Sequence, residues 1–203
     1  MAHVRVKFCG MTRRADIEHA AALGVEAIGL VFVERSPRAV TIEQAERLCR
    51  ALPPWLSVVG LFMDAPAAAV ESVLARVPLN WLQFHGSETP AYCRAFGRPW
   101  IKALPMASPG QVQYDRWNDA SALLLDAHAA GELGGSGLSF DWSRAVFPQR
   151  PWILAGGLSP DNLSEALAAA RPPAVDVSSG IESAPGIKSA EKMTVFMEIL
   201  RNG

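Results

Sequence analysis

The first candidate for chemistry is Cys9, a thiol at the end of the strand-like run 4–9. In parallel α/β folds, reactive side chains gather where strands end, so a cysteine at this position can act as a reagent. Lys7 would share its strand face, and its ammonium would favour the thiolate. Free cysteines are also among the most buried residues, and position alone favours simple packing for Cys9.

Asp126 ends a second apolar run, residues 122–126. A carboxylate at the end of a buried strand is costly unless it is hydrogen-bonded or functional. Because burial raises the pKa of a carboxyl group, Asp126 would be able to protonate a leaving or ring oxygen. An aspartate that caps a loop is an equal alternative. For Asp176, inside a later run, we expect a role in ordering loops or neighbouring backbone.

Two glycine turns follow the last two strand-like runs, at Gly156-Gly157 and at Ser179-Gly180. Glycines let backbone N–H groups approach phosphate oxygens closely, and a nearby helix N-terminus adds a favourable dipole. Turns at consecutive strand ends therefore indicate a phosphate site, and the absence of a Walker lysine motif favours a small sugar phosphate. A third cluster, around Gly135, predicts a mobile lid, a further phosphate cradle or a plain flexible loop.

Arg38 and His85 also follow strand-like runs. Arg38 would hold a substrate carboxylate through a two-point hydrogen bond, although a solvated surface arginine is the commoner case. For His85 we expect a structural or substrate-lining role, because no metal-ligand spacing surrounds it.

Eight short strand-like runs must position these side chains. They cover residues 4–9, 27–33, 57–62, 81–84, 100–104, 122–126, 152–155 and 174–178. Most are continuously apolar, as in strands buried on both faces, and segments of helical period separate several of them. Thr41 with Gln44 predicts a capping box, and Ser159-Pro160 predicts a helix start. We therefore predict one α/β domain over residues 1–203, a compact (β/α)8 TIM barrel, with an open doubly wound sheet as the alternative.

The composition narrows the class of protein. Half of the 203 residues are hydrophobic, 19% are charged and the net charge is −1. We therefore expect a folded domain that binds no nucleic acid and no membrane. No apolar run reaches the ~18–20 residues that span a bilayer, and no secretory signal is evident. Three widely spaced cysteines predict reduced thiols in the cytoplasm, and no zinc-type spacing indicates a metal.

In order along the chain, these segments resemble the phosphoribosylanthranilate isomerase family. The matching segments are VKFCGMT (6–12), SPR (36–38), QFHG (83–86), LLD (124–126), GGSG (134–137), FDW (140–142), LAGGL (154–158), DVSSGIE (176–182) and PGIK (185–188). The resemblance extends over nearly the whole chain. It implies a (β/α)8 barrel that catalyses the Amadori rearrangement of N-(5-phospho-β-D-ribosyl)anthranilate in tryptophan biosynthesis, with no cofactor, as a monomer or homodimer.

The resemblance also implies roles for the residues. Asp126 matches the general acid that opens the ribose ring, and Cys9 the general base that then removes the C2′ proton. Arg38 matches the residue that receives the anthranilate carboxylate. The residues implied in phosphate binding are Gly156, Gly157, Ser179 and Gly180, with Gly135 as a weaker candidate.

The chain departs from the family pattern at Phe8, Phe84 and Ser189. The phenylalanines replace aliphatic residues, and Ser189 replaces an aspartate that precedes the last helix. The alternative functions are a related histidine-pathway isomerase, which has aspartate where this chain has Cys9, a bifunctional isomerase, or a non-catalytic barrel that binds a sugar phosphate.

Overall fold

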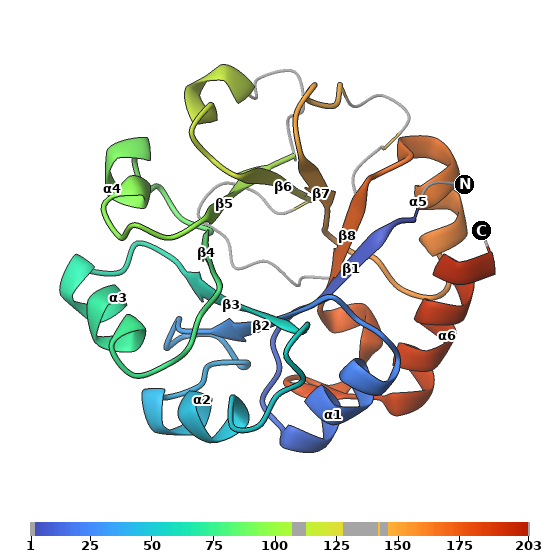
Figure 1. Ribbon diagram of the computed structural model, residues 1–203. Coiled ribbons are helices and arrows are strands. Elements are labelled where there is room, and N and C mark those ends of the chain that lie inside the picture. Colours follow the sequence, from blue (N-terminus) through green and yellow to red (C-terminus); the bar gives the residue numbers. More distant parts are fainter. Residues whose placement is uncertain (1–2, 107–112, 128–141, 143–145, 203) are drawn as a thin grey trace.

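Eight parallel strands close into a barrel in the order β1 to β8 (Figure 1). The computed structural model describes residues 3–106, 113–127, 142 and 146–202. The strands are β1 (Arg5–Phe8), β2 (Ala27–Val31), β3 (Ser57–Phe62), β4 (Trp81–Phe84), β5 (Trp100–Pro105), β6 (Ala122–Asp126), β7 (Trp152–Leu154) and β8 (Ala174–Val177). The TIM-barrel prediction is confirmed, and closure between β1 and β8 excludes the open sheet.

Each predicted run coincides with one barrel strand, and the ends differ by two residues at most. Apolar residues mark buried positions, and the chain stays buried beyond the last residue that pairs in the sheet. Cys9, for example, lies one residue beyond β1 and still donates its backbone N–H to Val177 O at 2.9 Å. The residues just after the strands are therefore fixed by the barrel itself.

Helices cover the outside of the barrel (Figure 1). They are α1 (Arg14–Ala22), α2 (Ile42–Leu48), α3 (Ala67–Leu74), α4 (Pro90–Arg94), α5 (Leu163–Ala170) and α6 (Ala190–Asn202), with the 3-10 helices η2 (Tyr114–Trp117) and η4 (Ser179–Ile181). None of the described helices is long and apolar enough to cross a membrane.

The two predicted helix starts have different outcomes. The capping box of α2 is confirmed, since Gln44 N donates to Thr41 Oγ1 at 3.2 Å and Thr41 N donates to Gln44 Oε1 at 2.7 Å. The start at Ser159 is wrong, because α5 begins at Leu163. Asn162 instead ties the preceding turn together, accepting from Ser159 N at 2.9 Å and donating to Gly157 O at 2.8 Å.

The core has two parts. The larger cluster packs the outer faces of the strands against the helices. A smaller cluster of five buried residues belongs to β3, β5 and β6 and to the end of β7: Val59, Ile101, Ala103, Leu124 and Ala155. By strand alternation, Leu124 shares its face with Asp126, so this second cluster fills the barrel beneath the carboxyl ends of the strands.

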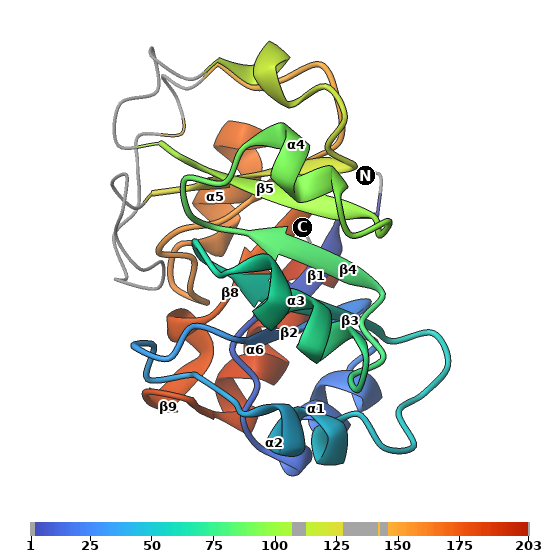
Figure 2. The ribbon, with the colours of Figure 1, turned by 90° about the vertical axis from the view of Figure 1, so that its left-hand side faces the viewer.

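A two-stranded hairpin, β9 (Glu182–Ala184) with β10 (Ile187–Lys188), follows β8 outside the barrel sheet. Figure 2 shows the barrel from the side, with β9 near its lower left edge. The hairpin carries two buried charged residues, Glu182 and Lys188, toward the end of the barrel that holds Cys9.

Candidate active site

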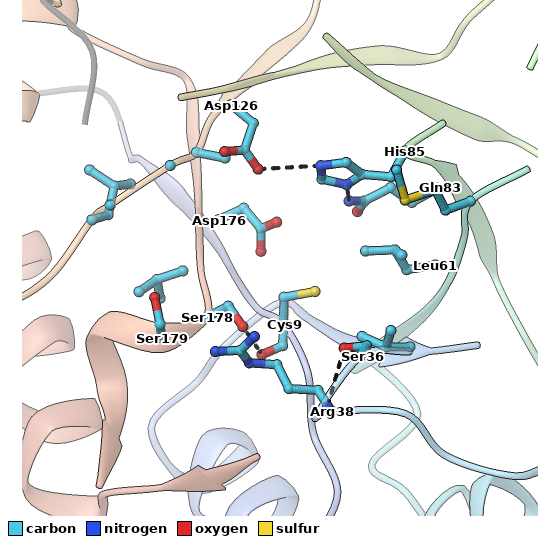
Figure 3. Close-up of a pocket in the computed structure, with 17 residues that line it drawn as sticks. Cys9, Ser36, Arg38, Leu61, Gln83, His85, Asp126, Asp176, Ser178 and Ser179 are labelled. Atoms are coloured by element: carbon cyan, nitrogen blue, oxygen red, sulfur yellow. Dashed lines mark hydrogen bonds and ion pairs between the residues drawn. The ribbon is translucent and has the colours of Figure 1, made fainter. Parts of the chain in front are cut away.

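A pocket lies at the carboxyl ends of the strands (Figure 3). The predicted site residues that line it are Cys9, Arg38, His85, Asp126, Gly156, Gly157 and Ser179. Gly180 is not among the lining residues, and it packs against Leu158, since a Cβ there would lie 1.9 Å from Leu158 O. Gly135 and its glycine cluster lie outside the described residues. The structure thus brings together side chains that are more than a hundred positions apart in the sequence.

Cys9 is 5% exposed, and Figure 3 shows its sulfur directed into the pocket. The neighbouring strand fits closely around it, because a Cβ on Gly29 would lie 2.7 Å from its Sγ. Burial raises the pKa of the Cys9 thiol, and the nearby Lys7 ammonium opposes that rise without cancelling it. The thiol therefore needs fixed positive charge if it is to ionise.

Lys7 and Asp176 supply a buried ion pair beside this thiol. Lys7 Nζ donates to Asp176 Oδ2 at 2.8 Å. Burial lowers the pKa of Lys7, but the charges and hydrogen bonds of Asp176 and Cys9 together outweigh burial and raise it overall. Lys7 is thus a cation at neutral pH. Asp176 lines the pocket and binds a side chain, so the prediction that it orders loops is wrong.

Asp126 and His85 face each other across the pocket (Figure 3). Asp126 Oδ2 lies 3.5 Å from His85 Nε2, and Gln83 Nε2 donates to His85 Nδ1 at 3.3 Å. The predicted substrate-lining position of His85 agrees with this place in the pocket.

Gly156 packs directly against Asp126. Its φ is +86°, and a Cβ at this position would lie 2.9 Å from Asp126 Oδ1 and 2.3 Å from Ala127 N. Gly157 follows with φ +64°. Glycine at position 156 therefore serves two purposes: it forms the turn after β7 and leaves room for the carboxylate.

Arg38 is 8% exposed, so the alternative of a solvated surface arginine is wrong. Its Nε and Nη2 donate to the two carboxylate oxygens of Glu182, each at 2.8 Å. Lys188 Nζ also donates to Glu182 at 2.8 Å. The sequence matched Glu182 and Lys188 to family motifs but assigned them no role, since Arg38 is 144 positions from Glu182.

Three further sequence expectations concern the surroundings of the pocket. All three cysteines are unpaired and buried, as expected for reduced thiols. Among the described residues, no cluster of three potential ligands could hold a metal ion. Ser189, the departure before α6, still caps that helix, because its Oγ accepts from Lys192 N at 3.3 Å.

Comparison with known proteins gives consistent matches. Residues 6–199 match the family described as N-(5'phosphoribosyl)anthranilate (PRA) isomerase. The N-(5'-phosphoribosyl)anthranilate isomerase of Acidithiobacillus ferrooxidans is 49% identical over 203 residues, covering 99% of each chain. The crystal structure of phosphoribosyl anthranilate isomerase from Thermus thermophilus is 39% identical, with a TM-score of 0.84 and coverage of 98% of this chain and 99% of that chain. A phosphoribosyl anthranilate isomerase solved in complex with reduced 1-(o-carboxyphenylamino)-1-deoxyribulose 5-phosphate is 32% identical, with a TM-score of 0.80, covering 98% and 100% of the two chains.

Proposed function

Since the chain belongs to the N-(5'-phosphoribosyl)anthranilate isomerase family, we propose that Cys9 and Asp126 carry out the acid–base chemistry of the family's reaction. The chain is an isomerase of tryptophan biosynthesis. It converts N-(5-phospho-β-D-ribosyl)anthranilate into 1-(2-carboxyphenylamino)-1-deoxy-D-ribulose 5-phosphate. The observation that supports the two roles is that one pocket contains both side chains.

Ring opening is the first step. Asp126, in its protonated form, donates a proton to the furanose ring oxygen. The C1′–O bond breaks, and the anilino nitrogen supplies electrons to form an iminium at C1′. His85 orients the carboxyl group through Nε2, and Gly156 limits the space in which it can move. General acid catalysis of this kind typically contributes ~10²–10⁴-fold.

Proton abstraction is the second step. The iminium makes the C2′–H bond acidic, and the Cys9 thiolate removes that proton to leave an enolamine. Lys7 stabilises the thiolate at the moment when it is needed, because its ammonium lies on the same strand face. The enolamine then gains a proton at C1′ and loses one from the C2′ hydroxyl, which gives the ketone.

After one turnover, the protonation states of the two catalytic groups are the reverse of those at the start. Cys9 holds the proton taken from C2′, and Asp126 lacks the proton given to the ring oxygen. The next turnover therefore requires one proton to pass from the thiol to the carboxylate. No net proton is consumed, and an external redox cofactor has no step to perform.

The two ends of the substrate bind on different loops. Arg38 takes the aromatic carboxylate, and the turns at Gly156-Gly157 and Ser179-Gly180 take the phosphate through backbone N–H groups. We expect Arg38→Ala to raise KM because the carboxylate loses its charged partner. We propose that the enzyme acts in the cytoplasm, as a monomer or homodimer.

The test uses the purified chain and two substrates. Consumption of phosphoribosylanthranilate is followed by the loss of its fluorescence, and the histidine-pathway aminoaldose is assayed in parallel. We expect turnover of the anthranilate compound and none of the other. Turnover of the histidine-pathway compound alone would overturn the proposal, and turnover of both would identify a bifunctional isomerase.

A further inference from the structure

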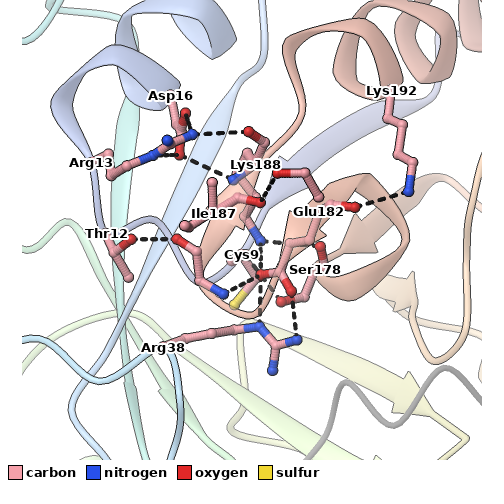
Figure 4. Close-up of polar contacts among 12 residues, drawn as sticks. Cys9, Thr12, Arg13, Asp16, Arg38, Ser178, Glu182, Ile187, Lys188 and Lys192 are labelled. Atoms are coloured by element: carbon pink, nitrogen blue, oxygen red, sulfur yellow. Dashed lines mark hydrogen bonds and ion pairs between the residues drawn. The ribbon is translucent and has the colours of Figure 1, made fainter.

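We propose that Glu182 is a positioning residue that aims Arg38 at the substrate's aromatic carboxylate. The inference rests on the proposed function, since it assumes that Arg38 binds that group. Glu182 itself does not line the pocket, so it would act through the arginine. Figure 4 shows the contacts that support this role.

The pairing of Glu182 with Arg38 uses only one edge of the guanidinium. Nε and Nη2 donate to Glu182, each at 2.8 Å, in the side-on arrangement. A guanidinium has five N–H donors, so Nη1 and the second hydrogen of Nη2 form another edge. Figure 4 shows the third nitrogen directed away from Glu182. That second edge matches the two oxygens of a carboxylate.

The stem of Arg38 is fixed as well. A Cβ on Gly10 would lie 2.5 Å from Arg38 Cδ and 3.2 Å from its Cγ, so the arginine packs on the residue next to Cys9. Gly10 has φ +75°, a conformation that suits glycine. The packed stem and the paired side edge together leave the guanidinium little freedom, and Arg38 lines the pocket.

The charges near this edge are unbalanced in a way that a carboxylate would correct. Burial raises the pKa of Glu182, but Arg38 and Lys188 outweigh burial and lower it, so Glu182 is ionised. One anion thus faces two buried cations. Buried charge without a partner is costly, and a bound carboxylate would complete the set of two cations and two anions.

The hairpin that carries Glu182 is held to the loop after β1. Arg13 Nη2 donates to Lys188 O at 2.9 Å, and Lys188 N donates to Asp16 Oδ2 at 3.2 Å. Thr12 adds a hydrogen bond from its hydroxyl to Gly186 O. Glu182 is therefore fixed relative to the strand end that bears Cys9, as a positioning residue must be (Figure 4).

The experiment compares two inhibitors that differ in one group. The first is reduced 1-(o-carboxyphenylamino)-1-deoxyribulose 5-phosphate, and the second is the same molecule without the ring carboxylate. The ratio of their dissociation constants measures the contribution of the carboxylate. For the unmodified protein we expect a ratio of about 10- to 100-fold, because hydrogen bonds to charged groups contribute on this scale.

In Glu182→Gln we expect this ratio to fall about tenfold, while the affinity for the inhibitor without the carboxylate stays unchanged. KM for the substrate should rise by a similar factor, with kcat within about threefold of the original. The matched control is Lys192→Met: Lys192 Nζ touches the backbone oxygen of Glu182 at 2.9 Å but not its carboxylate. The control should retain the full ratio.

A second variant keeps the test valid if Glu182→Gln does not fold. Arg38→Lys preserves the charge, but an ammonium has no fixed pair of edges to hold Glu182 and the ligand together. We expect the ratio to fall in this variant too. If Arg38→Lys kept the full ratio of the two dissociation constants, a positive charge alone would be sufficient to bind the carboxylate, and the inference would be overturned.

Other outcomes separate the inference from the proposed function. A higher ratio in Glu182→Gln would mean that Glu182 competes with the ligand for Arg38, and equal weakening of both inhibitors would mean a general structural role; either result overturns the inference and leaves the carboxylate site in place. An unchanged ratio in Arg38→Ala would instead refute the carboxylate site itself.

Discussion

Lys7 and Asp176 stand opposite each other in the register of β1 and β8, and their side chains form a 2.8 Å ion pair inside the barrel. Both are buried, with 4% and 8% exposure. Cys9 follows Lys7 on the same strand face, so a fixed ammonium and a fixed carboxylate both act on its thiol. The two charges move the thiol pKa in opposite directions, which makes their effects separable.

We expect Lys7→Met to move the acid limb of the kcat/KM pH profile upward. Lys7 lowers the pKa of Cys9, so its removal raises that pKa further above the ordinary thiol value. The base acts as the thiolate, so the rate at neutral pH would fall about tenfold for every pH unit by which the limb moves. The measurement is kcat/KM across the pH range in which the protein stays folded.

For Asp176→Asn we expect a shift of the pH profile in the opposite direction. Asp176 raises the pKa of Cys9, so its removal should move the same limb to lower pH while Lys7 remains charged. Movement of the limb in the same direction in both variants would indicate general disruption of the barrel interior. Alkylation rates of Cys9 against pH would give the thiol pKa directly, since the thiolate is the reactive form.

Removal of either catalytic group should abolish most turnover and leave binding intact. We expect Cys9→Ala and Asp126→Asn each to lose ~10²–10⁴-fold in kcat, the usual contribution of general acid or base catalysis. The affinity for the reduced product analogue should change little, because neither residue holds the phosphate or the carboxylate. Full activity in either variant would refute its assigned role.

The barrel was predictable because strands that are buried on both faces consist of continuous apolar runs, which can be recognised in the sequence. β3, β4 and β6 begin and end where the pattern predicts. The end of each apolar run also marks the strand end where the site lies, and this is why Cys9 and Asp126 were predicted as site residues. The Ser159 helix start failed because the Asn162 side chain satisfies the turn and delays the helix.

The pairing of charged residues was not predictable in the same way. Arg38 has the right position for a carboxylate, but nothing local indicates that Glu182 already takes one edge of it. Lys7 and Asp176 each look like isolated polar residues in apolar strands. Only closure of the barrel between β1 and β8 brings them together, and closure depends on the whole fold rather than on any local pattern.

The pH dependence of stability should reveal the Glu182 cluster. The folded pKa of Glu182 lies below its ordinary value of 4.5, so the cluster adds stability above that pH. This stability is lost as the pH falls below 4.5 and through the folded pKa, because protonation then costs less in the unfolded chain. We expect the difference in Tm between the unmodified protein and Glu182→Gln to be largest near neutrality and to shrink in acid. A constant difference at all pH values would contradict this.

Substitution of Gly156 by alanine should damage both catalysis and stability. The added Cβ would meet Ala127 N at 2.3 Å and Asp126 Oδ1 at 2.9 Å, so the carboxylate must move. A displacement of about 1 Å at a reacting group can cost ~10²-fold in rate, and we expect a fall of that order in kcat. The positive φ adds a backbone strain of about 1 kcal/mol.

Gly97→Ala is the matched control, because Gly97 also has a positive φ, +59°, yet nothing lies within 4 Å of its Cβ position. It should lose only the stability that the positive φ costs and keep full kcat, so a comparable kcat in both variants would show that Gly156 does not position Asp126.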